Sequence, residues 1–183
     1  MNKFKDMSNN LIFEVDQSIA FKQDTTGIYR FYRDGTDLDW PTTFVPYTPP
    51  VPPPTLADIQ AQQVAKISMD CQSAIYSGFN SSALGAIYHY PAKDQDQLNL
   101  VGAYSASLQP NIPTGWTTPF WCADSTGAWA LRPHTATQIQ QVYLDGVKYK
   151  TACIEQNDSL ATQIMNAATF DAVQAITWQN VPS

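Results

Sequence analysis

Cys122 and His134 are the residues whose types fit covalent catalysis, because a thiolate nucleophile needs a neighbouring base. Cys122 stands between Trp121 and Ala123 in a stretch that predicts a core strand, where a thiol usually packs as a small apolar group. His134 follows Pro133 and precedes a helix start, a position that favours local hydrogen bonds. We therefore expect no catalytic residues and no enzyme activity.

A cation site is the second chemistry to consider, because His89, Asp94 and Asp96 are close in sequence and carry suitable ligand atoms. The glycine and the terminal glutamate of a calcium-binding loop are missing from this stretch. Residues 94–99 fit a helix start better, with the aspartates near the positive end of the helix dipole. The sequence therefore predicts no metal and no cofactor, with a structural ion at the three residues as the alternative.

Carbohydrate chemistry is a third class. A glycosidase needs two carboxylates across the scissile bond, but every acid except Glu14 and Glu155 is an aspartate, mostly in predicted caps and turns. Trp116, Trp121 and Tyr104 are of a type that stacks on sugar rings in a binding site. Core packing is the competing interpretation for at least half of these aromatic side chains.

The helices that would position these residues begin at capping boxes and follow a helical apolar period. Thr55 with Asp58 opens a helix predicted to end near Tyr76. Thr135 with Gln138 opens a longer helix of about nine turns that closes the core. Both starts are local signals that do not depend on the rest of the fold.

The remaining elements complete a mixed domain. Residues 93–108 predict a second helix, Thr169 begins a short last helix, and the long helix is expected to bend at Gly146. Residues 82–90 predict one strand, and residues 120–131 predict two strands around a turn. The fold class is therefore α+β, with about three main helices packed on a small antiparallel sheet.

Residues 1–45 have a different pattern, with a strand-like piece at residues 28–32, an Asp34-Gly35 turn and no helical stripe. Such a segment has little room for a core of its own, so we predict an extended β-rich arm that attaches to a partner by strand addition. A small hairpin packed on its own domain is the alternative. The side chains expected to anchor in the partner are Tyr29, Phe31, Trp40, Phe44 and Tyr47.

A proline-rich linker is predicted between the arm and the domain. Six of the nine residues from Pro46 to Pro54 are proline, which favours a stiff polyproline-like spacer. The predicted organisation is an attachment arm at residues 1–45, a linker at 46–54 and a globular domain at 55–183.

Charge and apolar runs argue against several classes of partner. The 183-residue chain has a formal charge of −6 and no cluster of Lys or Arg, so it lacks the cations that bind nucleic acid or anionic lipid. No apolar run is long enough for a signal peptide or a membrane span. The three widely spaced cysteines fit buried thiols in a protein made in a reducing cytoplasm.

A set of residues and short segments in the C-terminal part carries a family resemblance: Cys71, Gly78, Phe79, 83–85, 94–100, 121–129 and 134–138. Through them the stretch from Thr55 to Trp178 resembles an uncharacterised domain that recurs in tail and tail-fibre-associated proteins of tailed bacteriophages. The segments 33–40 and 46–54 are similar to the aspartate-, tryptophan- and proline-rich run of tail-fibre assembly proteins. The resemblance carries no catalytic residues.

The resemblance implies a structural adaptor of the phage tail, associated with tail fibres or the baseplate and attached through its N-terminal arm. It would be made in the host cytoplasm and located in the virion. The implied partners are other tail or fibre proteins in a symmetric assembly or homo-oligomer, with a host-surface glycan as a further candidate. A tail-fibre assembly chaperone and a glycan-binding, receptor-recognising module are the alternatives.

Overall fold

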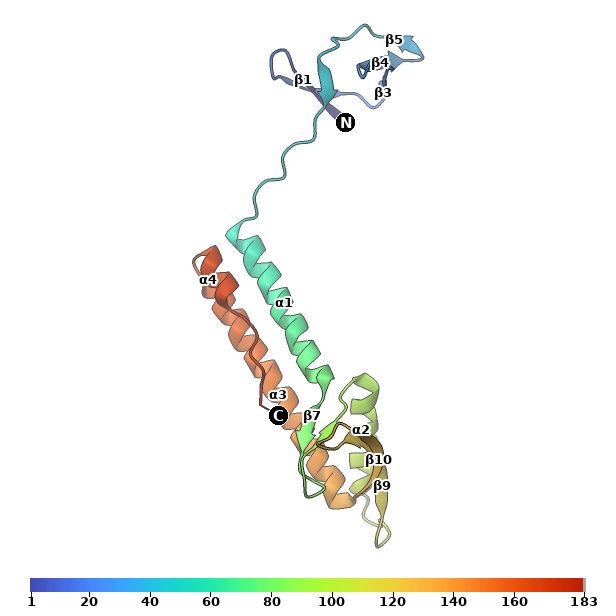
Figure 1. The fold of residues 1–183 in the computed structure, drawn as a ribbon, viewed down its shortest axis with the longest axis vertical. Coiled ribbons are helices and arrows are strands. Elements are labelled where there is room, and N and C mark those ends of the chain that lie inside the picture. Colours follow the sequence, from blue (N-terminus) through green and yellow to red (C-terminus); the bar gives the residue numbers. More distant parts are fainter. Residues whose placement is uncertain (183) are drawn as a thin grey trace. The chain divides into compact units, whose positions relative to one another are not determined.

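The computed structural model describes residues 1–182, and the chain divides into two compact units. The N-terminal unit comprises Met1–Pro53, and the C-terminal unit begins at Pro54 (Figure 1). The N-terminal unit is β-rich, and the C-terminal unit combines helices with a small antiparallel sheet. The predicted α+β fold class is confirmed.

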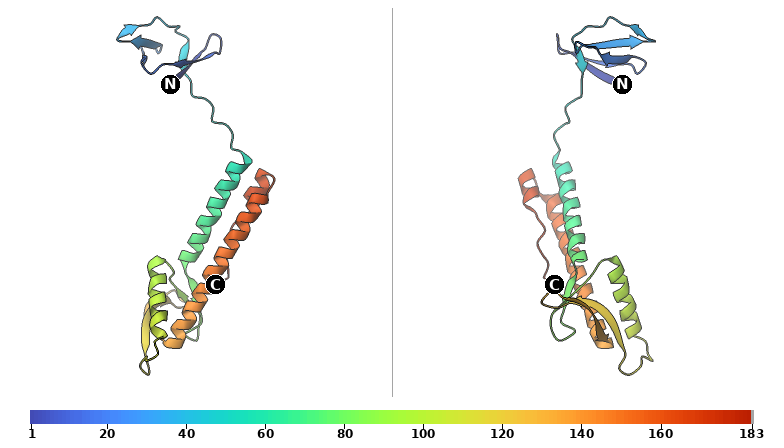
Figure 2. Two further views of the ribbon diagram at one scale, coloured as in Figure 1. Left: turned by 180° about the vertical axis from the view of Figure 1, so that it is seen from behind. Right: turned by 45° about the vertical axis from the view of Figure 1, so that its right-hand side comes forward.

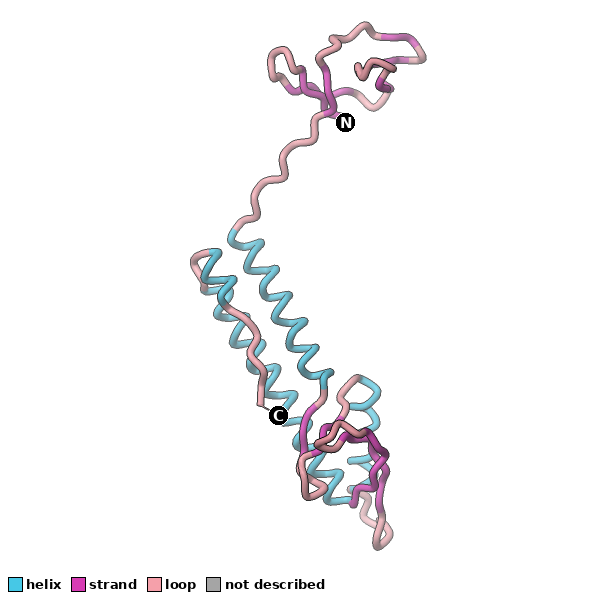
Figure 3. Tube along the Cα trace, in the orientation of Figure 1, coloured by secondary structure: helices cyan, strands magenta, loops and turns pink. Residues whose placement is uncertain are grey.

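Six short strands build the N-terminal unit as two three-stranded antiparallel sheets (Figure 3). One sheet has the order β2-β1-β6 and the other has the order β3-β4-β5. The strands are β1 (Asn2–Asp6), β2 (Ile12–Val15), β3 (Ala20–Gln23), β4 (Tyr29–Arg33), β5 (Thr36–Asp37) and β6 (Phe44–Pro46).

Aromatic side chains from both sheets form a core for the N-terminal unit. Phe4 is fully buried, and its ring meets that of Phe31 edge-on at 4.7 Å. The rings of Phe44 and Trp40 also lie beside the Phe31 ring, with centroid-to-centroid distances of 5.9 and 4.8 Å respectively. The expectation of an arm without a core was therefore wrong, because strands far apart in sequence bring their apolar groups together.

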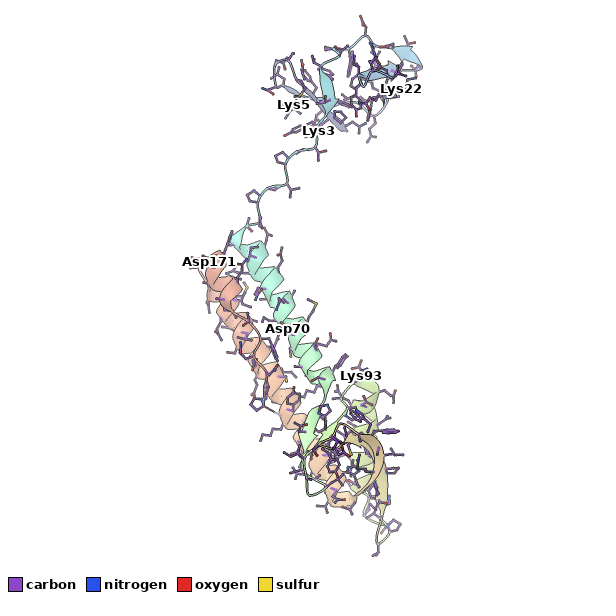
Figure 4. All side chains as sticks on the ribbon, in the orientation of Figure 1. Lys3, Lys5, Lys22, Asp70, Lys93 and Asp171 are labelled. Carbon is purple, nitrogen blue, oxygen red and sulfur yellow. The ribbon has the colours of Figure 1, made fainter. Side chains whose placement is uncertain are left out.

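Asp6 ties the turn after β1 to the segment before β6. Its carboxylate accepts hydrogen bonds from the Thr43 hydroxyl at 2.6 Å, from the Ser8 N–H at 2.9 Å and from the Asn9 amide at 2.9 Å. These bonds, the Thr43 bond first, lower the pKa of Asp6. The neighbouring Lys3 and Lys5 lie on β1 (Figure 4).

Within residues 54–182, the C-terminal unit contains four helices and a four-stranded antiparallel sheet of order β10-β9-β8-β7. The expected single strand at 82–90 was wrong, because Gly85 turns the chain with φ +90° between two short strands. The elements are α1 (Leu56–Ser77), β7 (Phe79–Ser81), β8 (Tyr88–Tyr90), α2 (Asp94–Ser107), β9 (Thr117–Ala123), β10 (Trp129–Thr135), α3 (Ala136–Asn166) and α4 (Phe170–Ala175).

Both predicted capping boxes are present. The Thr55 hydroxyl accepts the N–H of Asp58 at 3.2 Å, and the Asp58 carboxylate accepts the N–H of Thr55 at 2.8 Å. Thr135 and Gln138 make the same reciprocal pair at the start of α3. These side chains satisfy backbone groups that a helix terminus leaves free.

Helices α1 and α3 run antiparallel, and α1 packs along the later part of α3 (Figures 1 and 2). Gln60 of α1 joins the two helices at the C-terminal end of α3. Its buried amide donates to the carbonyls of Ile164, Met165 and Ala167 at 3.1–3.2 Å. Gln60 therefore caps the last carbonyls of α3 from a neighbouring helix. Among residues 1–182, no helix is both long and apolar enough for a membrane span.

The segment after α4 returns along α3 (Figure 2). The Gln63 amide donates to the Ile176 carbonyl at 2.6 Å, and the Gln156 amide donates to the Gln179 carbonyl. One side of the α1–α3 pair is thus covered by the chain's own C-terminal segment.

A second core lies where the sheet packs on α2 and α3, around Phe79 and Tyr90. A Cβ atom at Gly146 would lie 2.8 Å from the Phe79 ring, so a side chain at this position would collide with the core. Helix α3 continues through Gly146 without interruption. The missing side chain at this position provides room for the Phe79 ring.

Candidate functional site

The thiol and imidazole that suggested covalent chemistry lie on the inner face of the β9–β10 hairpin, and both are fully buried. The Cys122 thiol is approached by the Arg132 guanidinium at 3.8 Å, and no hydrogen bond joins it to His134 among residues 1–182. A buried thiol without a neighbouring base has the character of a packing group.

His134 is held as a neutral ring by two fixed partners. The Arg132 carbonyl lies 2.9 Å from Nδ1 and can only accept, so Nδ1 carries the proton and Nε2 accepts from the Tyr90 hydroxyl at 2.9 Å. Burial lowers the pKa of His134 and raises the pKa of Tyr90, which keeps both groups uncharged. The imidazole lone pair is therefore already used in joining β8 to β10.

The three residues of the proposed cation site have separate partners. His89 bonds the Ser77 carbonyl at 2.8 Å and the Asn80 side chain at 3.1 Å, and Asp94 accepts from the Tyr76 hydroxyl at 2.8 Å. No group of three His, Cys, Asp or Glu side chains suited to a metal ion occurs within residues 1–182. The structure therefore does not bring His89, Asp94 and Asp96 together as a ligand set.

The five aromatic residues expected to bind a partner differ in how far they are exposed, and none of them is fully exposed. Phe31 is 1% exposed and Phe44 is 7% exposed, because both belong to the core of the N-terminal unit, so they are not available as anchors. Tyr29 and Trp40 are half-buried against the same core. Tyr47 is half-buried, and its backbone N–H donates to the Lys3 carbonyl at 2.8 Å.

The outer face of the β9–β10 hairpin exposes large apolar side chains. Trp121 is 52% exposed and lies opposite Leu131, which is also 52% exposed, in the antiparallel register. Trp129 is 49% exposed near the turn, where its ring meets that of His89. Strand alternation explains this face, because Phe120 and Cys122 point inward to the core.

A pocket of about 560 Å³ lies between α2 and this hairpin, and we call it the α2–β9 pocket. Its walls combine apolar side chains with hydrogen-bonding groups. Leu98 is 66% exposed, and a Cβ atom at Gly102 would meet nothing within 4 Å. The lining residues that matter below are Asp96, Leu98, Asn99, Gly102, Thr118, Trp121 and Leu131.

A smaller pocket of about 150 Å³ lies between α1, α2 and α3 and has a different character. Phe79, Leu100 and Val147 give it an apolar lining, and Lys150 donates to Gln97 at 2.7 Å among its polar residues. Its size and apolar walls fit a gap in side-chain packing more than a polar ligand site.

Sequence reasoning identified Trp121 as a stacking candidate but missed the wall that faces it. Tyr104 stacks on Tyr143 at 4.0 Å, and Trp116 is half-buried against the core, so both are chiefly packing groups. Gly102 of α2 lines this facing wall, and a Cβ atom there would meet nothing within 4 Å. The sequence carries no local signal for such a wall.

These features define a protein with a β-rich unit followed by an α+β unit, in which the α2–β9 pocket combines apolar and hydrogen-bonding walls. Residues 58–177 match the family described as "Domain of unknown function (DUF4376)", and the chain belongs to that family. No curated protein and no solved structure matches the chain. The family match lies within the C-terminal unit and leaves the N-terminal unit outside it.

Proposed function

We propose that this chain is a non-enzymatic adaptor of a bacteriophage tail, made in the host cytoplasm and present in the virion beside tail fibres or the baseplate. The observation that supports this most directly is the joining of two units with separate cores by a proline-rich segment. One unit attaches to the tail, and the other is the module that it carries. The phage context of the proposal rests on the resemblance of the segments 33–40 and 46–54 to tail-fibre assembly proteins.

The attachment surface is the free edge of β2, since Phe31 and Phe44 are internal. The Asp6 N–H donates to the Leu11 carbonyl at 2.9 Å, so alternate residues along β2, Ile12 and Glu14, point their backbone groups away from β1. Leu11, Ile12 and Phe13 are 57%, 47% and 39% exposed. An edge strand with these properties fits an added strand from a tail-fibre subunit.

Virion incorporation tests this attachment. In the phage that encodes the chain, Ile12→Lys places a charge on the edge strand and should remove the protein from purified particles, measured by quantitative mass spectrometry. Ile87→Lys is the matched control, because Ile87 is 67% exposed but lies in the C-terminal unit. Full incorporation of the Ile12→Lys protein would refute β2 as the attachment surface.

A fibre-assembly chaperone is the second candidate, favoured by the resemblance of the N-terminal segments rather than by the C-terminal unit. The two functions differ in when the protein leaves its partner. A copy number in mature virions that matches the fibres supports the adaptor, since tail parts are built symmetrically. Detection only in infected-cell lysate, together with misfolded fibres when the gene is deleted, supports the chaperone.

A further inference from the structure

The α2–β9 pocket pairs an exposed indole with hydrogen-bonding groups on the facing wall. Trp121 and Leu131 supply an apolar surface from the hairpin, and Asn99 and Asp96 supply polar atoms from α2. The Asn99 carbonyl accepts from Gln95 at 3.0 Å, which leaves its NH₂ group able to donate. Asp96 uses one carboxylate oxygen for the Lys93 N–H at 3.1 Å, so the other can accept.

This combination matches the chemistry of a sugar ring. A pyranose has one face of C–H groups that packs on an aromatic ring and a rim of hydroxyls that both donate and accept. A volume of about 560 Å³ lies within the usual range of about 300–1,000 Å³ for small-molecule sites. An entirely apolar partner would take the Asn99 NH₂ group and the second Asp96 carboxylate oxygen out of water without offering them a hydrogen bond, which is costly.

Charge further restricts the ligand. No Lys or Arg is among the residues that line the pocket, whereas Asp96 contributes a carboxylate. Phosphorylated, sialylated or otherwise anionic ligands need cationic partners in a site. The pocket therefore favours a neutral saccharide.

Gly102 has no role in the fold that explains its presence. It lies inside α2, where glycine is less favourable than alanine, and a Cβ atom there would contact nothing within 4 Å. A larger side chain at this position would extend into the pocket that Gly102 lines. The glycine keeps the pocket open, in contrast to Gly146, which the Phe79 ring requires.

We propose that the α2–β9 pocket is a binding site for a neutral carbohydrate, with Trp121 as the stacking surface and Asp96 and Asn99 as hydroxyl partners. This inference does not depend on how the N-terminal unit attaches. It gives the C-terminal unit a recognition role that the family description does not assign.

The test applies the full-length protein to an array of neutral hexose and N-acetylhexosamine oligosaccharides, alongside sialylated and phosphorylated ones. We expect binding to neutral members only. Trp121→Ala should reduce affinity by about tenfold or more, and Gly102→Leu should weaken binding because the added side chain extends into the pocket. Trp129→Ala is the matched control, because Trp129 is 49% exposed on the same hairpin, close to the 52% of Trp121, but does not line the pocket.

Unfolding temperatures of the three variants separate binding from folding, and Gly102→Leu should remain folded because the space is open. An array without neutral signals for the wild-type protein would overturn the proposal. Equal losses in Trp121→Ala and Trp129→Ala would also overturn it. A silent array with an altered oligomeric state in Trp121→Ala would identify the pocket as a contact between copies and refute a sugar site.

Discussion

The two units contain hairpins with the same turn but use those hairpins differently. Residues 24–28 (DTTGI) connect β3 to β4, and residues 124–128 (DSTGA) connect β9 to β10. In each turn the Asp carboxylate accepts a backbone N–H and the hydroxyl of the Thr two residues later, and then the N–H four residues later. A glycine with positive φ follows the Thr in both turns.

An arginine on the second strand completes each turn by pairing with the aspartate, Arg30 at 3.2 Å and Arg132 at 3.0 Å. Beyond the turn the two hairpins differ. The first places Phe31 in an aromatic core, whereas the second packs its inner face on helices and leaves Trp121 exposed. Turn chemistry is thus local and repeated, and the surrounding core decides which face of a hairpin is free.

The substitution Phe31→Ala should give the largest difference in stability between the two units. Removing a fully buried ring costs about 3–5 kcal/mol, which is about the whole stability expected for a unit of this size. Residues 1–53 should lose amide protection in hydrogen-exchange measurements, while the C-terminal unit keeps it. Leu11→Ala is the control, because Leu11 is 57% exposed. Equal loss of protection in both units would show that they do not fold independently.

Gln60→Leu should weaken the C-terminal unit alone. The substitution keeps the side-chain size but removes the donor to three carbonyls at the end of α3, at a cost of about 1–3 kcal/mol. Urea unfolding measures the loss in the free energy of unfolding, and hydrogen exchange at residues 160–167 shows whether the loss is at the end of α3. Gln62→Leu, at an exposed position of the same helix, should change stability little. A similar loss in both variants would contradict the capping role.

A small gain in stability is expected from Gly102→Ala, by about 0.5–1 kcal/mol, because alanine is the better helix former and the space is open. Gly146→Ala should have the opposite sign, since the added methyl group meets the Phe79 ring. Thermal unfolding of the two variants in parallel compares them directly. If Gly102→Ala lowered the unfolding temperature, the glycine would have a structural role.

The two matched turns should weaken together in acid. Hydrogen bonds, from Thr26 and Thr126 first, lower the pKa of Asp24 and Asp124 below that of the unfolded chain. The unfolded state therefore takes up more protons, and the stabilisation present at neutral pH is lost as pH falls below about 4. Amide chemical shifts of Ile28 and Ala128 should follow this change. Asp24→Asn and Asp124→Asn should each remove it from their own turn only.

Local signals in the sequence predicted the C-terminal helices well. Thr55 and Thr135 fixed two helix starts because a capping box involves residues only three positions apart. The core of the N-terminal unit was not predictable in this way, because Phe4 and Phe44 meet through strand pairing across the whole unit. Short strands with little alternation carry no signal for such pairing.

Only one wall of the candidate site could be predicted from the sequence, because the other wall depends on packing between distant parts of the chain. Trp121 was identifiable by residue type, and its outward direction follows from strand alternation against the buried Phe120. The facing wall depends on how α2 packs beside the sheet, which brings Asn99 and Gly102 within reach of residues that lie far along the chain. No local pattern encodes that distance.

The buried cysteines have a practical consequence for kinetics. All three, Cys71, Cys122 and Cys153, lie in the C-terminal unit and are free and buried. Burial raises the pKa of the Cys71 and Cys153 thiols, and the thiolate is the form that alkylating reagents attack. The rate of alkylation in the native protein therefore measures how often the C-terminal unit opens. The cysteine-free N-terminal unit contributes nothing to that rate, so the wild-type chain already carries a unit-specific probe of opening.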